Sequence, residues 1–115
     1  MKNGLSTNSG GTKWWYVDGK LHRDNDLPAI EFRSGTKEWY MNGKHHRGND
    51  LPAVEYVDGS KYWYVEGKRH RGNGPAIVAD NGTYFEYWIN GKRINDIPTD
   101  KLLNKEQLEI YITFM

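Results

Sequence analysis

Residues 43–53 of the chain read GKHHRGNDLPA, and two other stretches repeat this pattern. Residues 19–29 read GKLHRDNDLPA, and residues 67–76 read GKRHRGNGPA. Related segments precede them: GTKWWYVD begins at Gly11, GTKEWYMN at Gly35 and GSKYWYVE at Gly59. The clearest copies are therefore 24 residues apart. Each motif in the sequence thus has to be interpreted as part of a repeating unit.

A fourth copy, GTYFEYWINGKRIND from Gly82, departs from the other three. It has one extra residue before its turn, has Ile94 and Asn95 in place of His-Arg, and ends in IPT. A divergent last copy is typical of a stacked array, because that unit has a neighbour on one side only. We expect a repeat array over residues 11–98, with units starting near residues 11, 35, 59 and 82, and a separate C-terminal segment at 99–115.

Composition and charge exclude several functional classes. The chain has 115 residues and a formal charge of +1, so no global field attracts a nucleic acid or a membrane surface. It has no cysteine, which excludes disulfides, thiol nucleophiles and thiolate metal ligands. No apolar run approaches the roughly 18 residues of a membrane helix, and the N-terminus lacks the apolar segment of a secretory signal. We expect a cytoplasmic protein, no cofactor, and a flexible leader at residues 1–10.

Glycine-containing turns divide each unit into short strands. One set favours two-residue hairpin loops, which require positive φ; it comprises Asp18-Gly19, Asn42-Gly43, Glu66-Gly67 and Asn90-Gly91. A second set joins successive units and comprises Ser34-Gly35, Asp58-Gly59 and Asn81-Gly82, while the loops 24–28, 48–52 and 72–75 contain proline. The pattern predicts a mainly β fold: a single-layer antiparallel β-meander of about four hairpin repeats with about three strands per unit.

Two-residue turns also predict which residues face each other. Around Asn42-Gly43, Tyr40 faces His45 and Glu38 faces Arg47, and around Ser34-Gly35, Ile30 faces Trp39. One face then collects apolar residues and histidine: Phe32, Ile30, Trp39, Met41, His46, Tyr56, Val54, Trp63, Val65 and His70. The opposite face is charged and aromatic: Glu31, Glu38, Arg47, Ala29, Tyr40, His45, Glu55, Tyr62, Arg71, Ala53, Tyr64 and Arg69.

The recurring histidines do not fit a metal site. With three strands per unit at about 4.8 Å per strand, His22, His46 and His70 stand on the order of 14 Å apart. Zinc ligands all lie about 2 Å from one ion, so these three cannot share a metal. We interpret them as structural residues that donate from one ring nitrogen to a loop carbonyl, because buried polar groups are nearly always hydrogen-bonded.

These units resemble the MORN repeat, which reads approximately Tyr-x-Gly-x-Trp-x-x-Gly-Lys-x-His-Gly-x-Gly. The matching segments are WYVDGKLHR, WYMNGKHHR and WYVEGKRHR, with VDGSKYWY as the junction. The resemblance implies an elongated, twisted single-layer sheet with a groove, used in relatives as a scaffold for protein contacts and in some for lipid. Variant arrays of this kind occur in bacterial and viral genomes, where some resemble antitoxins or phage accessory proteins, so the resemblance implies a binding protein.

The main departure from that pattern is an arginine in place of the glycine after each histidine. Arg47 opposite Glu38 predicts an ion pair, whereas Arg23 opposite Trp14 and Arg71 opposite Tyr62 predict guanidinium stacking. These arginines either only stabilise an exposed face or take part in binding, because Tyr, Trp and Arg carry much of the energy of interfaces. The candidate binding residues are Tyr16, Arg23, Tyr40, Arg47, Tyr64 and Arg71.

The C-terminal segment loses the repeat. Asn104 with Gln107 three residues later forms a capping-box pattern, and Leu108, Tyr111 and Ile112 follow at helical spacing. We predict a helix at about 105–114, although its β-branched residues also suit a strand. The helix either caps the last unit or serves as a dimerisation element, since YITFM leaves apolar groups to be covered.

The sequence contains no nucleophile elbow, P-loop or HExxH motif, and its carboxylates recur as members of the repeat. We therefore expect a non-enzymatic module that binds another protein, as an inhibitor or antitoxin-like blocker of bacterial or phage origin. The competing hypothesis is sequestration of a nucleotide or another phosphate-bearing ligand by arginines and aromatic rings. A membrane-associated scaffold ranks third, because no basic amphipathic stretch supports it.

Overall fold

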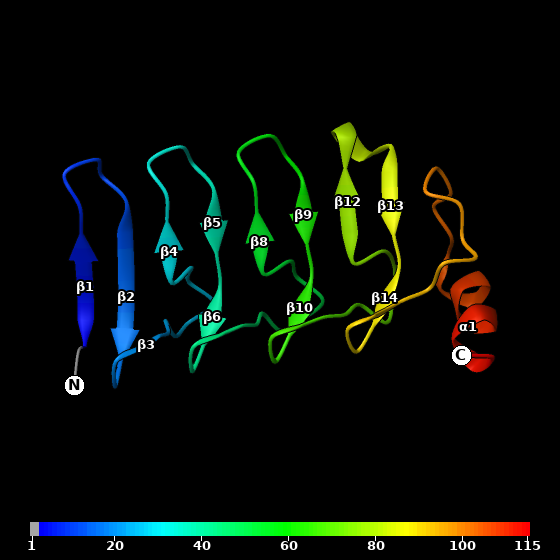
Figure 1. The fold of residues 1–115 in the computed structure, drawn as a ribbon, viewed down its shortest axis with the longest axis horizontal. Coiled ribbons are helices and arrows are strands. Elements are labelled where there is room, and N and C mark those ends of the chain that lie inside the picture. The colour runs from blue at the N-terminus through cyan, green and yellow to red at the C-terminus, as the bar shows by residue number, and fades with distance from the viewer. Residues whose placement is uncertain (1–2) are drawn as a thin grey trace.

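The structure, a computed structural model that describes residues 3–115, confirms the mainly β, single-layer antiparallel meander with one C-terminal helix (Figure 1). Eight strands follow one another across the main sheet. They are β1 (Gly4–Thr7), β2 (Lys13–Val17), β4 (Ile30–Glu31), β5 (Lys37–Glu38), β8 (Val54–Glu55), β9 (Lys61–Tyr62), β12 (Ile77–Ala79) and β13 (Tyr84–Glu86). The molecule measures 45 × 27 × 20 Å.

Short hairpins extend the second strand of each unit. They are β2 with β3 (Lys20–Leu21), β6 (Tyr40–Met41) with β7 (Lys44–His45), β10 (Tyr64–Val65) with β11 (Lys68–Arg69), and β14 (Trp88–Ile89) with β15 (Lys92–Arg93). Each unit therefore contributes two strands to the width of the main sheet, and not the expected three. The reason is that each hairpin continues along the strand direction and adds no strand beside the others (Figure 1). At about 4.8 Å per strand, successive units stand about 10 Å apart and not 14 Å.

The register between units is one residue away from the expected one. Phe32 N–H donates to Thr36 O and Gly35 N–H to Phe32 O, both at 2.9 Å, so the loop has three residues. Its glycine, with φ of 106°, occupies the bulge position of such loops. Ile30 therefore faces Glu38 and not Trp39, and a shift of one residue moves Ile30 to the other face. The pairing of Tyr40 with His45 is confirmed.

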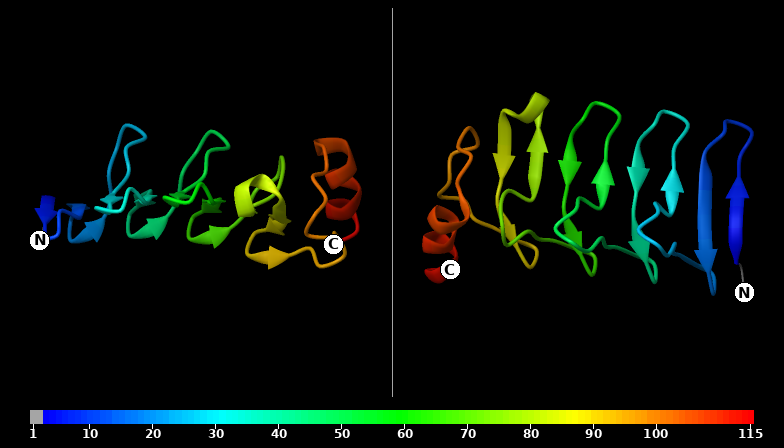
Figure 2. Two further views of the ribbon diagram at one scale, coloured as in Figure 1. Left: turned by 90° about the horizontal axis from the view of Figure 1, so that it is seen from above. Right: turned by 180° about the vertical axis from the view of Figure 1, so that it is seen from behind.

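The two faces of the sheet are covered by different parts of the structure. On one, the loop face, Trp39 and Trp63 are buried beneath the proline-containing loops, which project from the same side as the helix (Figure 2). On the other, the ladder face, the buried Ile30, Val54 and Ile77 lie between rows of aromatic and charged side chains. The expected apolar face, which combines Ile30 and Val54 with the tryptophans, is therefore wrong.

Histidines connect each unit to the next. Nδ1 of His22, His46 and His70 accepts the backbone N–H of Asn42, Glu66 and Asn90, respectively, at 3.0, 3.1 and 2.9 Å. The acceptor role differs from the expected donation to a loop carbonyl, because the neighbouring hairpin turn brings an N–H to the ring. In the first unit, the Asn3 side chain serves the Asp18 N–H in the same way.

The N-terminal segment differs from the expected flexible leader. Residues 4–7 form strand β1, which pairs with β2 along its whole length, from Gly4 opposite Tyr16 to Thr7 opposite Lys13. Pairing of backbone groups orders this segment, although its side chains carry no repeat pattern. Residues 1–2 lie outside the described residues.

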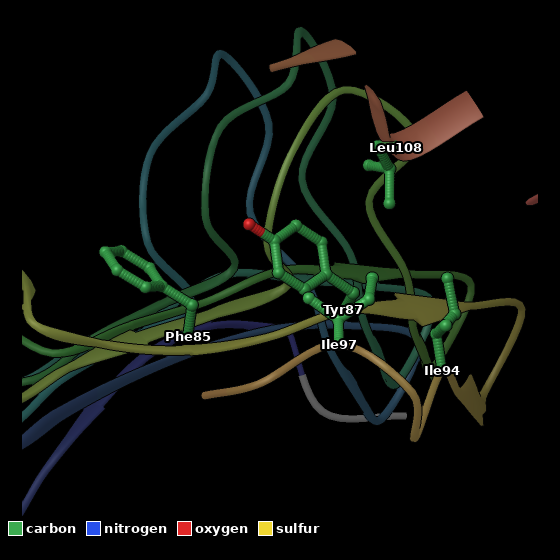
Figure 3. Packing of buried hydrophobic residues seen from close by; sticks show 5 residues of the cluster. All are labelled: Phe85, Tyr87, Ile94, Ile97 and Leu108. Atoms are coloured by element: carbon green, nitrogen blue, oxygen red, sulfur yellow. The ribbon is translucent and has the colours of Figure 1, made fainter. Parts of the chain in front are cut away.

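The C-terminal helix α1 (Lys105–Thr113) and its Asn104–Gln107 capping box are confirmed. Leu108 is fully buried and packs onto the last unit (Figure 3), in a cluster with Phe85, Tyr87, Ile94 and Ile97. The Tyr87 hydroxyl donates to Lys101 O at 2.9 Å and accepts the Leu103 N–H at 2.8 Å. Tyr87 occupies the position of Trp63, so the helix and the segment before it cover the last unit as a loop covers the others. Among residues 3–115, no helix is both long enough and apolar enough to cross a membrane.

Replacement of Leu108 by alanine should lower the free energy of unfolding by about 3 kcal/mol, because the side chain is 0% exposed and leaves a cavity. Ile110→Ala is the matched control, since Ile110 is 63% exposed and its loss should change the free energy by less than about 0.5 kcal/mol. Urea denaturation followed by tryptophan fluorescence measures both. Equal losses would contradict the capping role of α1.

The histidine contacts predict a difference between two variants of His46. His46→Ala removes the acceptor of the Glu66 N–H and should cost about 1 kcal/mol of unfolding free energy. His46→Asn keeps an acceptor at nearly the same place and should lose less. Urea denaturation gives the stabilities, and hydrogen exchange of the Glu66 amide should accelerate in the alanine variant only. Similar exchange in both variants would show that the hydrogen bond has no such role.

Candidate functional site

The structure divides the six candidate binding residues between the two faces. Tyr40 pairs with His45 on the ladder face, where the equivalent Tyr16 and Tyr64 also lie. Arg47 instead stacks on Trp39, the neighbour of Tyr40 that points to the loop face. The tyrosines and the arginines therefore do not form one surface.

On the loop face, the interior arginines are held by several groups. Arg47 lies 3.8 Å from the ring centre of Trp39 and is 11% exposed. Its Nε and Nη2 donate to the Asp26 carboxylate at 2.8 and 3.2 Å, and its Nη1 donates to Pro52 O and Glu55. The Arg47 hydrogen bond lowers the pKa of Asp26 from its ordinary value. This guanidinium joins two units and closes its own loop.

The expected partners of the arginines are wrong. Arg23 stacks on Trp15 and not Trp14, Arg71 stacks on Trp63 and not Tyr62, and Arg47 pairs with Asp26 and Glu55 and not Glu38. The reason is that the hairpin pairing ends before the arginine. The Arg47 N–H, for example, donates to Tyr64 O of the next unit at 3.4 Å, and the chain then turns onto the loop face.

On the ladder face, one ring per unit recurs every 24 residues and a second side chain stands beside it. We call this set the ring ladder; it comprises Tyr16, Leu21, Tyr40, His45, Tyr64, Arg69, Trp88 and Arg93. His45 lies between two tyrosines, with ring-centre distances of 4.2 Å to Tyr40 and 4.8 Å to Tyr64. Arg69 lies 5.3 Å from the Tyr64 ring and 4.9 Å from the Trp88 ring. The side chains thus connect neighbouring units.

Two carboxylates fix the orientation of the ring ladder. Glu38 accepts from His45 Nε2 at 2.6 Å and from the Tyr40 hydroxyl at 3.1 Å. The His45 hydrogen bond, with that of Tyr40, lowers the pKa of Glu38 despite its burial. Burial, with the nearby Glu38 charge, raises the pKa of Tyr40 well above its ordinary value of 10.0. In the last unit, Glu86 accepts the Trp88 Nε1–H at 2.9 Å. The rings are therefore ordered by the protein itself.

Grooves lie between the proline-containing loops and beside the C-terminal helix. Two equivalent ones, of about 230 and 280 Å³, lie between successive proline-containing loops and are lined by Arg47, which is shared by both. A third, of about 460 Å³, lies beside α1 and is lined by Asp96, Ile110 and Phe114. Within residues 3–115, no group of three or more His, Asp or Glu side chains is arranged to hold a metal ion.

Sequence reasoning omitted three prominent members of the ring ladder from the candidate site: His45, Arg69 and Trp88. The signal for Trp88 was present, because it lies 24 residues after Tyr64. His45 and Arg69 occupy equivalent positions of successive units, as does Leu21 in the first unit. The residue type at this position changes from unit to unit. A search for identical letters passes over such a position, whereas a search for shared geometry finds it.

Comparison of the chain with protein-family models, with curated protein sequences and with solved structures finds no match in any of the three.

Alkaline pH should destabilise the protein through three tyrosines whose phenols ionise less readily in the folded state. The pKa values of Tyr40, Tyr56 and Tyr87 are all raised, chiefly by burial. A raised pKa in the folded state means that stability is intact below the unfolded value of about 10 and falls as pH rises above it. Between pH of about 8 and about 11, the urea midpoint should fall in the wild type and fall less in Tyr40→Phe. An equal fall in both would contradict a role for Tyr40.

Proposed function

We propose that this chain is a non-enzymatic repeat module that binds another protein, and that the ring ladder is its contact surface. The observation that carries the proposal is the continuity of the ladder, since rings and bridging side chains contact one another from Tyr40 in the second unit to Trp88 in the fourth. Tyr, Trp and Arg are the residue types that supply most binding energy at protein interfaces.

The order already present in the ring ladder supports the same proposal. Tyr40 and His45 are held by Glu38, and Trp88 is held by Glu86, so their side chains lose little conformational freedom when a partner arrives. The rings are half-buried, which leaves their edges and hydroxyl groups to contact a partner. The Tyr64 hydroxyl accepts from Arg69 at 2.7 Å, which leaves its own hydrogen for an acceptor on the partner.

The competing function, capture of a phosphate-bearing small ligand, has less support. It requires several free guanidinium groups, whereas two of the three candidate arginines, Arg47 and Arg71, each hold an aspartate with two nitrogens. We further propose that the module belongs with the MORN-like repeats and acts in the cytoplasm as an inhibitor or antitoxin-like blocker. The support is the resemblance of its units to that repeat, together with the aromatic and arginine residues of the ring ladder.

A photo-crosslinking experiment tests the proposed surface. With p-benzoylphenylalanine in place of Tyr64, an aromatic ring remains in the ladder, and irradiation in a bacterial lysate should join the chain to a discrete protein. The matched control carries the same group in place of Phe114, which is 84% exposed and lies outside the ladder. Adducts at both positions, or at position 114 alone, would contradict the ring ladder as the contact surface. A thermal shift with nucleotides but no discrete adduct would favour ligand capture.

A further inference from the structure

Each interior junction of the loop face is closed by a single aspartate from the preceding unit. The Asp26 carboxylate accepts from Nε and Nη2 of Arg47, while its backbone carbonyl accepts from Trp39 Nε1 at 3.1 Å. Asp50 serves Arg71 and Trp63 in the same way, with its carbonyl 3.0 Å from Trp63 Nε1. One residue in a left-handed turn, with φ of 56° at Asp26 and 58° at Asp50, therefore satisfies three donors.

The three members of this junction change together in the fourth unit. Tyr87 stands where the tryptophan is expected, Asn95 where the arginine is, and Gly74 in the preceding loop where the aspartate is. No separate aspartate is needed there, because the segment before α1 satisfies the Tyr87 hydroxyl. In the second, third and fourth units, an aspartate in the preceding loop thus accompanies a tryptophan and an arginine, and it is absent where both are replaced.

The first unit carries the tryptophan and the arginine without the aspartate. Arg23 stacks 3.6 Å from the centre of the Trp15 ring, and its Nη1 donates to Pro28 O and Glu31. Within residues 3–115, however, neither the Nε and Nη2 of Arg23 nor the Nε1 of Trp15 has a hydrogen-bond partner. The Arg23 side chain is 22% exposed, against 11% for Arg47.

Strand β1 completes the sheet at this end but not the loop face. It pairs with β2, and Asn3 serves the Asp18 N–H as a histidine does elsewhere. In the view along the sheet, loops project from the array further along the chain, whereas none projects from β1 at the N-terminal end (Figure 2). Among residues 3–115, the three donors are consequently left without an acceptor.

We propose that Trp15 and Arg23 form a docking site for an aspartate-bearing loop of a partner protein. The partner's carboxylate accepts from Nε and Nη2 of Arg23, and the carbonyl of the same aspartate accepts from Trp15 Nε1. The occupant is specified by the interior junctions, which show the same donors filled by an Asn-Asp-Leu-Pro turn. The site is separate from the ring ladder and does not depend on the function proposed for it.

A second copy of this chain fits the site less well. Its C-terminal unit contains Asn95-Asp96-Ile97-Pro98, which repeats the letters of the Asn25-Asp26-Leu27-Pro28 turn almost unchanged. Asn25 and Asp26 have φ of 63° and 56°, whereas Asn95 and Asp96 are not among the described residues with positive φ. Asp96 also lines the groove beside α1, so its surroundings differ from those of the interior loops.

The test uses a cyclised peptide that carries Gly-Asn-Asp-Leu-Pro-Ala, copied from residues 48–53, and an otherwise identical peptide with asparagine in place of the aspartate. Each of the five tryptophans gives one indole N–H signal in a nitrogen–proton correlation spectrum. The aspartate peptide should shift the Trp15 signal, with a dissociation constant of about 1 mM or tighter, and leave Trp39 and Trp63 unmoved. The asparagine peptide should bind at least about ten-fold more weakly.

Protein variants complete the test. Arg23→Gln should weaken binding of the aspartate peptide by about ten-fold or more, whereas the control Arg33→Gln, at an exposed position, should leave it unchanged. No shift of any indole signal overturns the proposal. A shift of Trp88 in place of Trp15 also overturns it and moves the peptide to the ring ladder. A Trp15 shift that appears on concentrating the protein alone and disappears in Asp96→Asn identifies a second copy as the occupant, and overturns the partner loop.

Discussion

Burial of one tryptophan in each interior unit by the loop of the preceding unit is the constraint on which the array depends. Trp39 is 6% exposed and Trp63 7%, and each indole N–H is satisfied by a carbonyl from the neighbouring loop. A unit on its own has no such loop, so it would expose a large apolar ring and an unpaired donor. Stability is therefore a property of junctions between units, and the junctions determine how the array begins and ends.

The sequence predicts the hairpins well because one or two residues determine the geometry of each turn. Asn42 and Gly43 both have positive φ, which few other residue types adopt, so the Tyr40–His45 pairing can be counted outward from the turn. The turn at Ser34-Gly35 is less informative, because the same letters suit a two-residue or a three-residue loop. The structure has the three-residue loop. Its additional residue shifts the register by one, so Ile30 lies on the ladder face. The expected number of strands per unit was also too high, so the predicted distance between the histidines of successive units was too long.

The candidate site was predictable on one face only. Tyr16, Tyr40 and Tyr64 lie within regular hairpins, where alternation of side chains gives the face directly. The arginines follow the last paired residue. The positions of Arg47 and Arg71 are set by contacts with the tryptophan in the same unit and with an aspartate 21 residues earlier in the chain. Periodicity carries no information about such a contact until the loop that brings the aspartate is known. The histidines were correctly interpreted as structural, but their partners lie in the next unit, 20 residues later.

The two faces also separate two kinds of interaction. Contacts along the ladder face connect equivalent positions, so every unit contributes a similar ring and a partner can span several of them. Contacts on the loop face have a direction, because an aspartate always serves the unit that follows it. At the C-terminal end, Tyr87 and α1 close this series of contacts. At the N-terminal end, Arg23 and Trp15 have the same donor groups as an interior unit but no aspartate among residues 3–115 to accept from them. Since the faces are opposite, occupation of one leaves the other accessible.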